Sequence, residues 1–104
     1  MAGKESPVSI PRKPAYEAAI PEGMVAATAP MVGTFYRAPA PGAKPFVEVG
    51  DRVQADDTVC LLEVMKLFNS LKAGATGTVE KILVENAALV AAGQPLILIR
   101  KDVD

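Results

Sequence analysis

The stretch Glu63-Val64-Met65-Lys66-Leu67-Phe68-Asn69 sets one lysine between two apolar runs. The first run is residues 58–62 and the second is residues 67–72. Two apolar runs joined by a short turn predict a β-hairpin, and the tip of a hairpin projects from the body of its domain. We therefore predict that Lys66 is exposed at such a tip. Most exposed lysines are only solvated surface charges, so this position does not by itself assign a function.

The composition indicates one small globular domain. The chain has 104 residues, half of them apolar, with no Trp and no His, so its core must be aliphatic. A net charge of -1 gives no electrostatic reason to expect nucleic acid or an anionic membrane as a partner. No apolar run is long enough to span a membrane, and the first residues lack the pattern of a signal peptide.

Catalysis by the chain alone is disfavoured by the same composition. Without histidine the chain lacks the usual general base, the imidazole metal ligand and the Ser-His-Asp arrangement. Cys60 is the only cysteine, so no internal disulfide can form, and its apolar neighbours predict a small buried side chain. We expect no catalytic residue and no metal site.

Short extended segments separated by turns fill most of the chain. Residues 1–23 contain four prolines and are predicted to be a flexible tail that tethers a domain spanning residues 24–104. Only residues 87–92 hint at a helix, and they are too few to form one alone. Many short strands at turn spacing predict a small all-β sandwich or barrel. The predicted extended segments are 25–29, 33–37, 46–49, a short one from Val53, 58–62, 67–72, 77–84, 89–90 and 96–99.

The two halves of the chain resemble each other. Most matches are offset by 37 residues and an upstream one by 44, so the first half holds a seven-residue insertion, best placed in the Pro-rich stretch 38–44. The matches pair Val47 with Val84, Val53 with Val90, Ala55 with Ala92, 59–62 with 96–99, and Gly33-Thr34 with Gly77-Thr78. Two copies related by a pseudo-twofold axis can bury their apolar faces against each other, with the chain ends at one pole and Lys66 at the other. Chance similarity between short strands is the alternative.

A family resemblance rests on these residues. Glu63-Val64-Met65-Lys66-Leu67 resembles the biotin-attachment motif, in which a Met-Lys pair occupies a hairpin tip. Residues 24–101 resemble the biotinyl domain of bacterial and plastid acetyl-CoA carboxylase carrier subunits, most closely over 29–37 and 46–53. The resemblance implies a flattened barrel of two antiparallel four-stranded sheets, covalent biotin on Lys66, and a subfamily-specific loop called the thumb at residues 38–45.

The resemblance also implies which residues surround the cofactor. Residues beside the lysine would contact the modifying ligase or partner enzymes, although ordinary turn packing is an alternative. The thumb would cover the biotin ring, although a merely tolerated insertion is an alternative. The implied cofactor-binding set is Lys66, Met65, Val64, Leu67, Ala38, Pro39, Ala40, Pro41, Gly42, Ala43 and Lys44.

The implied function is that of a non-catalytic carrier. It would move carboxylate between biotin carboxylase and carboxyltransferase of acetyl-CoA carboxylase, the first step of fatty acid synthesis, after modification by a biotin protein ligase. Its expected location is the cytoplasm, or the plastid stroma in a plant or alga. Alternatives are a carrier for another biotin-dependent carboxylase, a lipoyl-type acyl carrier and an unmodified β-module. Lipoyl domains typically show Asp-Lys-Ala where this chain has Met65-Lys66-Leu67.

Four positions depart from the family pattern. Val64 stands where Ala is usual, and it adds bulk next to the tip. Asp56 and Ala87 stand where Gly is usual, and Ala tolerates left-handed backbone less well than Asp. Ala38 stands where a hydroxyl residue would be able to hydrogen-bond biotin.

Overall fold

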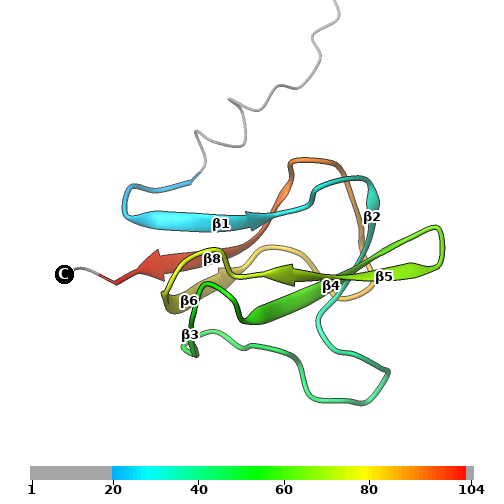
Figure 1. Ribbon diagram of the computed structural model, residues 1–104, viewed down its shortest axis with the longest axis horizontal. Coiled ribbons are helices and arrows are strands. Elements are labelled where there is room, and N and C mark those ends of the chain that lie inside the picture. The colour runs from blue at the N-terminus through cyan, green and yellow to red at the C-terminus, as the bar shows by residue number, and fades with distance from the viewer. Residues whose placement is uncertain (1–19, 103–104) are drawn as a thin grey trace, which may run out of the picture.

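The computed structural model describes residues 20–102, and within them all regular structure is strand (Figure 1). The strands form two four-stranded antiparallel sheets, a first sheet of order β1-β8-β6-β3 and a second of order β5-β4-β2-β7. The bounds are β1 Met24–Thr28, β2 Gly33–Tyr36, β3 Arg52–Val53, β4 Thr58–Val64, β5 Leu67–Lys72, β6 Gly77–Ile82, β7 Leu89–Val90 and β8 Pro95–Lys101. The predicted all-β architecture is confirmed. Of the expected tail, residues 1–19 lie outside the described part of the chain.

The core is aliphatic, as the composition predicts. Inward residues alternate along β2 because successive strand side chains point to opposite faces. In β4 the consecutive Val59 and Cys60 are both buried, at the point where the register with β5 shifts. Phe35 is the only aromatic ring in the core, and no polar or charged residue of the described chain is buried. The core cluster is Ala27, Ala29, Phe35, Val47, Val53, Val59, Cys60, Leu62, Ala73, Val79, Val90, Leu96, Ile97 and Ile99.

The internal repeat appears in the topology. Exchanging β1 with β5, β2 with β6, β3 with β7 and β4 with β8 turns the strand order of the first sheet into that of the second. The register repeats as well, because Val53 lies opposite Gly77 and Val90 lies opposite Gly33. The predicted pseudo-twofold arrangement is therefore confirmed.

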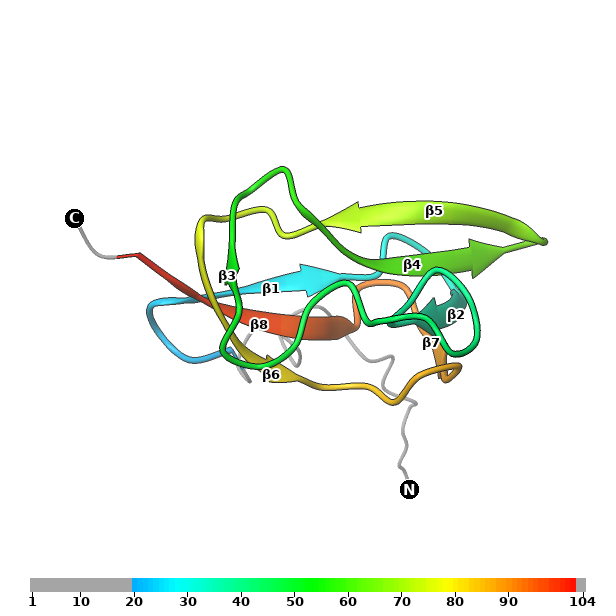
Figure 2. The same ribbon diagram turned by 90° about the horizontal axis from the view of Figure 1, so that it is seen from below.

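The two ends of the described chain lie together, away from the β4–β5 hairpin. The Lys101 N–H donates to the Gly23 carbonyl at 3.1 Å, which ties the start of β1 to the end of β8. The hairpin tip lies at the far side of the molecule in both views (Figures 1 and 2). The arrangement of chain ends and Lys66 at opposite poles follows from the two-copy architecture.

One predicted extended segment is wrong. Residues 46–49 belong to no strand, because the Phe46 N–H donates back to the Arg37 carbonyl at 2.7 Å and the Glu48 N–H donates to Asp51 Oδ2 at 2.9 Å. These bonds close a loop and start a turn, so the Phe46 and Glu48 N–H groups are not available for a ladder. Residues 87–92 form no helix, as expected from their small number: Ala87 takes a φ of 70°, outside the helical range, and the predicted short strand 89–90 is β7.

Candidate functional site

The β4–β5 hairpin ends in a two-residue turn made of Met65 and Lys66. Val64 pairs with Leu67, and the φ angles of Met65 and Lys66 are 51° and 68°. Positive φ at both central residues defines a type I′ turn, which normally uses Asn and Gly. A residue with a side chain costs about 1–3 kcal/mol in such a conformation, and it persists only where the surrounding structure enforces it. The paired strands therefore hold the lysine in a strained, defined position.

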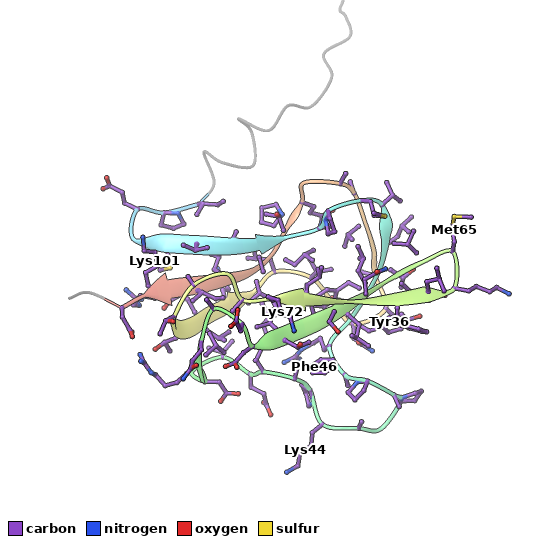
Figure 3. All side chains as sticks on the ribbon, in the orientation of Figure 1. Tyr36, Lys44, Phe46, Met65, Lys72 and Lys101 are labelled. Carbon is purple, nitrogen blue, oxygen red and sulfur yellow. The ribbon has the colours of Figure 1, made fainter. Side chains whose placement is uncertain are left out.

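The tip is open to solvent, as predicted. Met65 is 89 % exposed and Leu67 is 69 % exposed, and Figure 3 shows Met65 at the extremity of the hairpin. Within residues 20–102, neither a hydrogen bond nor an ion pair engages the Lys66 amine. Val64 instead packs against the core and contributes no bulk to the outer side of the turn. The tip thus presents an uncommitted primary amine between apolar side chains.

An apolar rim beside the tip comes from residues that the sequence analysis did not select. Met31 and Val32 are 47 % and 59 % exposed, and they precede Gly33, whose Cα faces Val64. Their positions in the second copy are Ala75 and Thr76, and the exposed Leu89 matches Arg52. The fold therefore does not require large apolar residues at these positions. Large apolar residues that occur in one copy and not in the other were a pattern in the sequence from which this rim could have been predicted.

The opposite pole carries charge pairs where the hairpin pole carries apolar groups. Arg52 binds Asp102 through two hydrogen bonds of 2.6 and 2.8 Å, and Arg100 binds Glu80 at 2.6 Å. The Arg52 hydrogen bond holds the pKa of Asp102 below its ordinary value. Both pairs are exposed to solvent, which screens their attraction, so they add little to stability. The two poles therefore differ in surface chemistry although their backbones are related.

The Pro-rich insertion forms a loop that stands away from the sheets (Figure 1). We call residues 38–45 the thumb. Its base is closed by the 2.7 Å bond from the Phe46 N–H to the Arg37 carbonyl, and its turn by a 3.0 Å bond from the Ala43 N–H to the Ala40 carbonyl. The Arg37 N–H donates to Asn86 Oδ1 at 2.8 Å and anchors the thumb to the β6–β7 connection. The insertion is thus held at its base by backbone bonds.

A cavity of about 530 Å³ lies between the thumb and the second sheet. Its floor includes Tyr36 and Phe68, whose ring centroids are 5.9 Å apart. The Tyr36 hydroxyl donates to Glu63 Oε1 at 3.2 Å, and this hydrogen bond raises the pKa of Tyr36. Phe68 lies two residues after Lys66, so the cavity begins close to the hairpin tip. A concave, mostly apolar surface with a few polar groups is the usual form of a small-molecule site.

The structure brings together only some of the predicted site residues. Thumb residues 38–43 line the cavity with Pro45, whereas Lys44 does not and is directed away from the sheets (Figure 3). The tip residues 64–67 do not line it either. The lysine and the thumb are therefore two neighbouring parts of the site, joined by Phe68.

The sequence analysis missed the remaining lining residues, which are Tyr36, Arg37, Phe68, Asn86 and Ala87. Arg37 is the one charged residue among all those that line the cavity. Its Nη2 donates to the Val47 carbonyl at 3.3 Å, and its Nε is buried with no acceptor among the described residues. A buried donor without a partner costs about 1–3 kcal/mol. These residues come from three separate segments, and no local pattern connects them.

Other kinds of site find no support in the described chain. No cluster of three His, Cys, Asp or Glu side chains within residues 20–102 is placed to ligate a metal. Nor does that part of the chain contain a helix of the length and apolarity needed to cross a membrane.

Comparison with known proteins identifies the class. The family model for biotin and lipoyl domains, described as "Biotin-requiring enzyme", matches residues 25–99. The chain belongs to this family.

Two similar relatives from different organisms have the same protein name. The chain is 51 % identical over 83 residues to the biotin carboxyl carrier protein of acetyl-CoA carboxylase from Nostoc sp., covering 80 % of this chain and 46 % of the relative. It is 51 % identical over 70 residues to the protein of that name from Pseudomonas aeruginosa, covering 67 % and 45 %. The chain thus spans slightly less than half the length of these relatives.

Solved structures agree with the fold. The urea carboxylase of Kluyveromyces lactis matches with a TM-score of 0.63 and 28 % identity, covering 95 % of this chain and 7 % of that one. A single-chain, multi-domain long-chain acyl-CoA carboxylase matches with a TM-score of 0.67 at 22 % identity, covering 82 % of this chain and 8 % of that one. The second likeness supports the fold alone.

Proposed function

We propose that this chain carries biotin in amide linkage to Lys66 and serves as the carrier of a biotin-dependent carboxylase, with acetyl-CoA carboxylase as the favoured enzyme. The observation that carries the proposal is the uncommitted Lys66 amine on a strained two-residue turn, in a chain of the biotin and lipoyl family. The thumb beside it and the relatives' shared name favour acetyl-CoA carboxylase.

The residues present fit a lysine-borne ring system. An exposed amine reaches an activated acyl group without rearrangement of the domain, and the neighbouring cavity of about 530 Å³ has apolar walls. In the attachment step the neutral Lys66 nitrogen attacks the biotinyl carbonyl of an adenylate. The amide bond forms, AMP leaves with the electron pair of the broken bond, and the nitrogen gives up a proton. The ligase supplies this activation, and the chain presents the nucleophile.

The hairpin supplies position rather than catalysis. Biotin, when bound, accepts carboxylate at one active site and releases it at another. The long lysine stem adds reach, while the enforced type I′ turn keeps its base fixed on the domain. Tethering raises the effective concentration of the carried group at both active sites. Met65, Leu67 and Val32 offer apolar contacts to the enzymes that must approach the tip.

The thumb shelters the ring in this proposal. Residues 38–43 form one wall of the cavity and Phe68 leads from the tip to its floor. Three prolines within residues 38–45 stiffen the wall, which lowers the entropic cost of holding a ligand against it. Ala38 has no hydroxyl, so polar contacts to the ring must come from other lining residues.

The proposed partners are a biotin protein ligase, biotin carboxylase and carboxyltransferase, and the proposed location is the cytoplasm or a plastid stroma. The match covers 46 % and 45 % of the length of the two relatives, which therefore extend well beyond this domain. For that reason the partners of the whole relatives are proposed for this chain. A second candidate is the carrier domain of another biotin-dependent carboxylase, which the structural likeness to urea carboxylase favours. Met65 before the lysine disfavours lipoylation, since lipoyl domains typically have Asp there.

The intact mass after incubation with biotin, ATP and a biotin protein ligase tests the proposal. We expect a gain of one biotinyl group in the wild-type chain and none in Lys66→Arg. Lys72→Arg is the matched control, because Lys72 is exposed at the end of β5, the strand that follows Lys66, and this variant should gain the group normally. A folded wild-type chain that gains nothing, or a Lys66→Arg variant that still gains the group, would refute attachment at Lys66.

A further inference from the structure

The thumb cavity contains a positive charge that no acidic group balances. Arg37 is the one charged residue in its lining, and no carboxylate lies within ion-pair distance of it in residues 20–102. Its guanidinium has five N–H donors, and the structure commits one of them, from Nη2 to the Val47 carbonyl at 3.3 Å. Nε is buried without an acceptor.

The polar groups around Arg37 do not neutralise it. The carbonyl of Arg37 accepts the Phe46 N–H and its own N–H donates to Asn86 Oδ1, so both belong to the backbone connections of the thumb. Glu63 is the carboxylate bonded to the Tyr36 hydroxyl, and it is not part of the lining. The remaining walls are alanine, proline, glycine and aromatic rings. An apolar cavity with one uncompensated cation favours an apolar ligand that carries a negative charge.

The occupant is available within the same molecule. Phe68 lines the cavity and lies two residues from Lys66, so a group carried on a long lysine arm starts beside it. The ureido ring is neutral before it takes up carboxylate and anionic afterwards. The charge of the cavity is therefore matched to only one of the two states of the arm.

We propose that Arg37 makes the thumb cavity selective for the carboxylated ring, so that the loaded arm docks under the thumb and the unloaded arm is released. The inference rests on the proposed attachment at Lys66. Arg37 acts here as a specificity-determining residue, because its guanidinium contacts the carboxylate while the apolar walls contact the ring in either state. Docking removes the carboxylate from water and from adventitious protons until a partner enzyme withdraws the arm.

The decisive experiment uses the unmodified chain and two soluble probes. One is 2-imidazolidone, which is neutral, and the other is 2-oxoimidazolidine-1-acetate, a stable anion on the same ring. Methyl resonances of Ala38, Ala40 and Ala43 report occupancy, since all three line the cavity. We expect the anion to bind about fivefold more tightly than the neutral probe, as for a partly exposed ion pair. Equal affinities, or no shift with either probe, would overturn the proposal.

Matched variants assign the effect to Arg37. Arg37→Gln should abolish the preference for the anion, and Arg37→Lys should retain part of it because the charge remains while the planar fork is lost. Lys44→Gln is the control, since it removes a thumb charge that does not line the cavity, and it should behave as wild type. The backbone bonds at the thumb base do not involve the Arg37 side chain, so the thumb should keep its conformation in these variants.

The lifetime of the carboxyl group on the biotinylated chain gives a second readout. The group should be lost about fivefold faster in Arg37→Gln than in wild type or Lys44→Gln, with the enzymes removed after loading. Equal lifetimes would overturn the sheltering role. Because the probe titration needs no biotin on Lys66, a failure of attachment and a failure of anion selectivity give different results.

Discussion

Ala87 holds a backbone conformation that suits glycine. Its φ is 70°, and the matching residue of the other copy is Gly50 at 97°. Both make the same bond, from the Ala87 N–H to the Phe35 carbonyl at 2.7 Å and from the Gly50 N–H to the Val79 carbonyl at 2.8 Å. The family departure at residue 87 therefore leaves the turn as tight as its counterpart. The second departure, Asp56, needs no such conformation, because its φ is not positive.

We expect Ala87→Gly to raise the free energy of unfolding by about 0.5–1 kcal/mol. Relief of the left-handed alanine exceeds the entropy that glycine adds to the unfolded chain. Urea unfolding of the two proteins measures the difference. Ala88→Gly is the control, because residue 88 has no positive φ, and it should lower stability instead. A loss of stability in Ala87→Gly would contradict the strain assigned to this position.

Cys60 couples stability to alkaline pH. Its side chain is fully buried, and burial raises the pKa of the thiol from the ordinary value of 9.0 to about 12. The unfolded chain loses the thiol proton from pH 9 upward while the folded chain keeps it. The contribution of the buried neutral thiol to the free energy of unfolding is therefore complete below pH 9. It declines between pH 9 and 12, by up to about 1.4 kcal/mol per pH unit.

Urea unfolding at pH 8 and pH 10.5 checks this expectation. Wild type should lose more stability between the two pH values than Cys60→Ala. In the variant the thiol is absent, while Tyr36 and the other ionisable groups still titrate. The native thiol should also resist alkylation at pH 9 until urea is added. Rapid alkylation of the folded chain, or equal pH dependence in both proteins, would show that the thiol is accessible.

At the scale of the element, the hairpin turn is strained by its own sequence. Met65 occupies the first position of a type I′ turn, where Asn is preferred, with a φ of 51°. Met65→Asn should raise the free energy of unfolding by up to about 1 kcal/mol, whereas the β-branched Met65→Val should lower it by at least about 1 kcal/mol. Thermal unfolding of the three proteins measures the order. Equal stabilities would mean that the hairpin end frays and enforces no turn.

Some of these elements were predictable from the sequence and others were not. The hairpin was predictable because residues 58–72 are consecutive, and so was the exposure of Lys66. Residues 46–49 were not, because the buried Val47 fits the pattern of a strand. In the structure the Phe46 and Glu48 N–H groups donate to the Arg37 carbonyl and to Asp51 Oδ2 instead of to a neighbouring strand. The repeat partner of Val47, Val84, packs on the core outside a strand as well. The sequence repeat thus predicted which residues pack on the core, but not whether they lie in strands.

The cavity was beyond sequence reasoning for a different reason. It forms where the thumb, Phe68 of β5 and Asn86 of the β6–β7 connection meet, and their separations in the chain carry no periodic pattern. The charge of Arg37 was visible in the sequence, but its separation from the carboxylates of residues 20–102 depends on the packed structure. Composition likewise predicted an aliphatic core without revealing that Val64 turns inward.

At the scale of the whole molecule, each sheet has one position where only glycine fits. A Cβ on Gly33 would lie 2.7 Å from the Glu63 carbonyl oxygen, and one on Gly77 would collide with the Arg100 carbonyl. We expect Gly33→Ala and Gly77→Ala each to lower the free energy of unfolding by about 1–3 kcal/mol. The controls Thr34→Ala and Thr78→Ala replace the next residue of each strand and should cost less. Urea unfolding of all four variants tests whether both copies share this close approach.

The bond between Gly23 and Lys101 has a consequence for protein engineering. Because the described ends meet at 3.1 Å on the side away from the hairpin, residues 23–101 form a closed unit with a single point of attachment. Such a unit can be spliced into an exposed loop of an unrelated host protein without stretching either polypeptide. The host would then display the reactive lysine at the far side of the insert, where a ligase has unobstructed access.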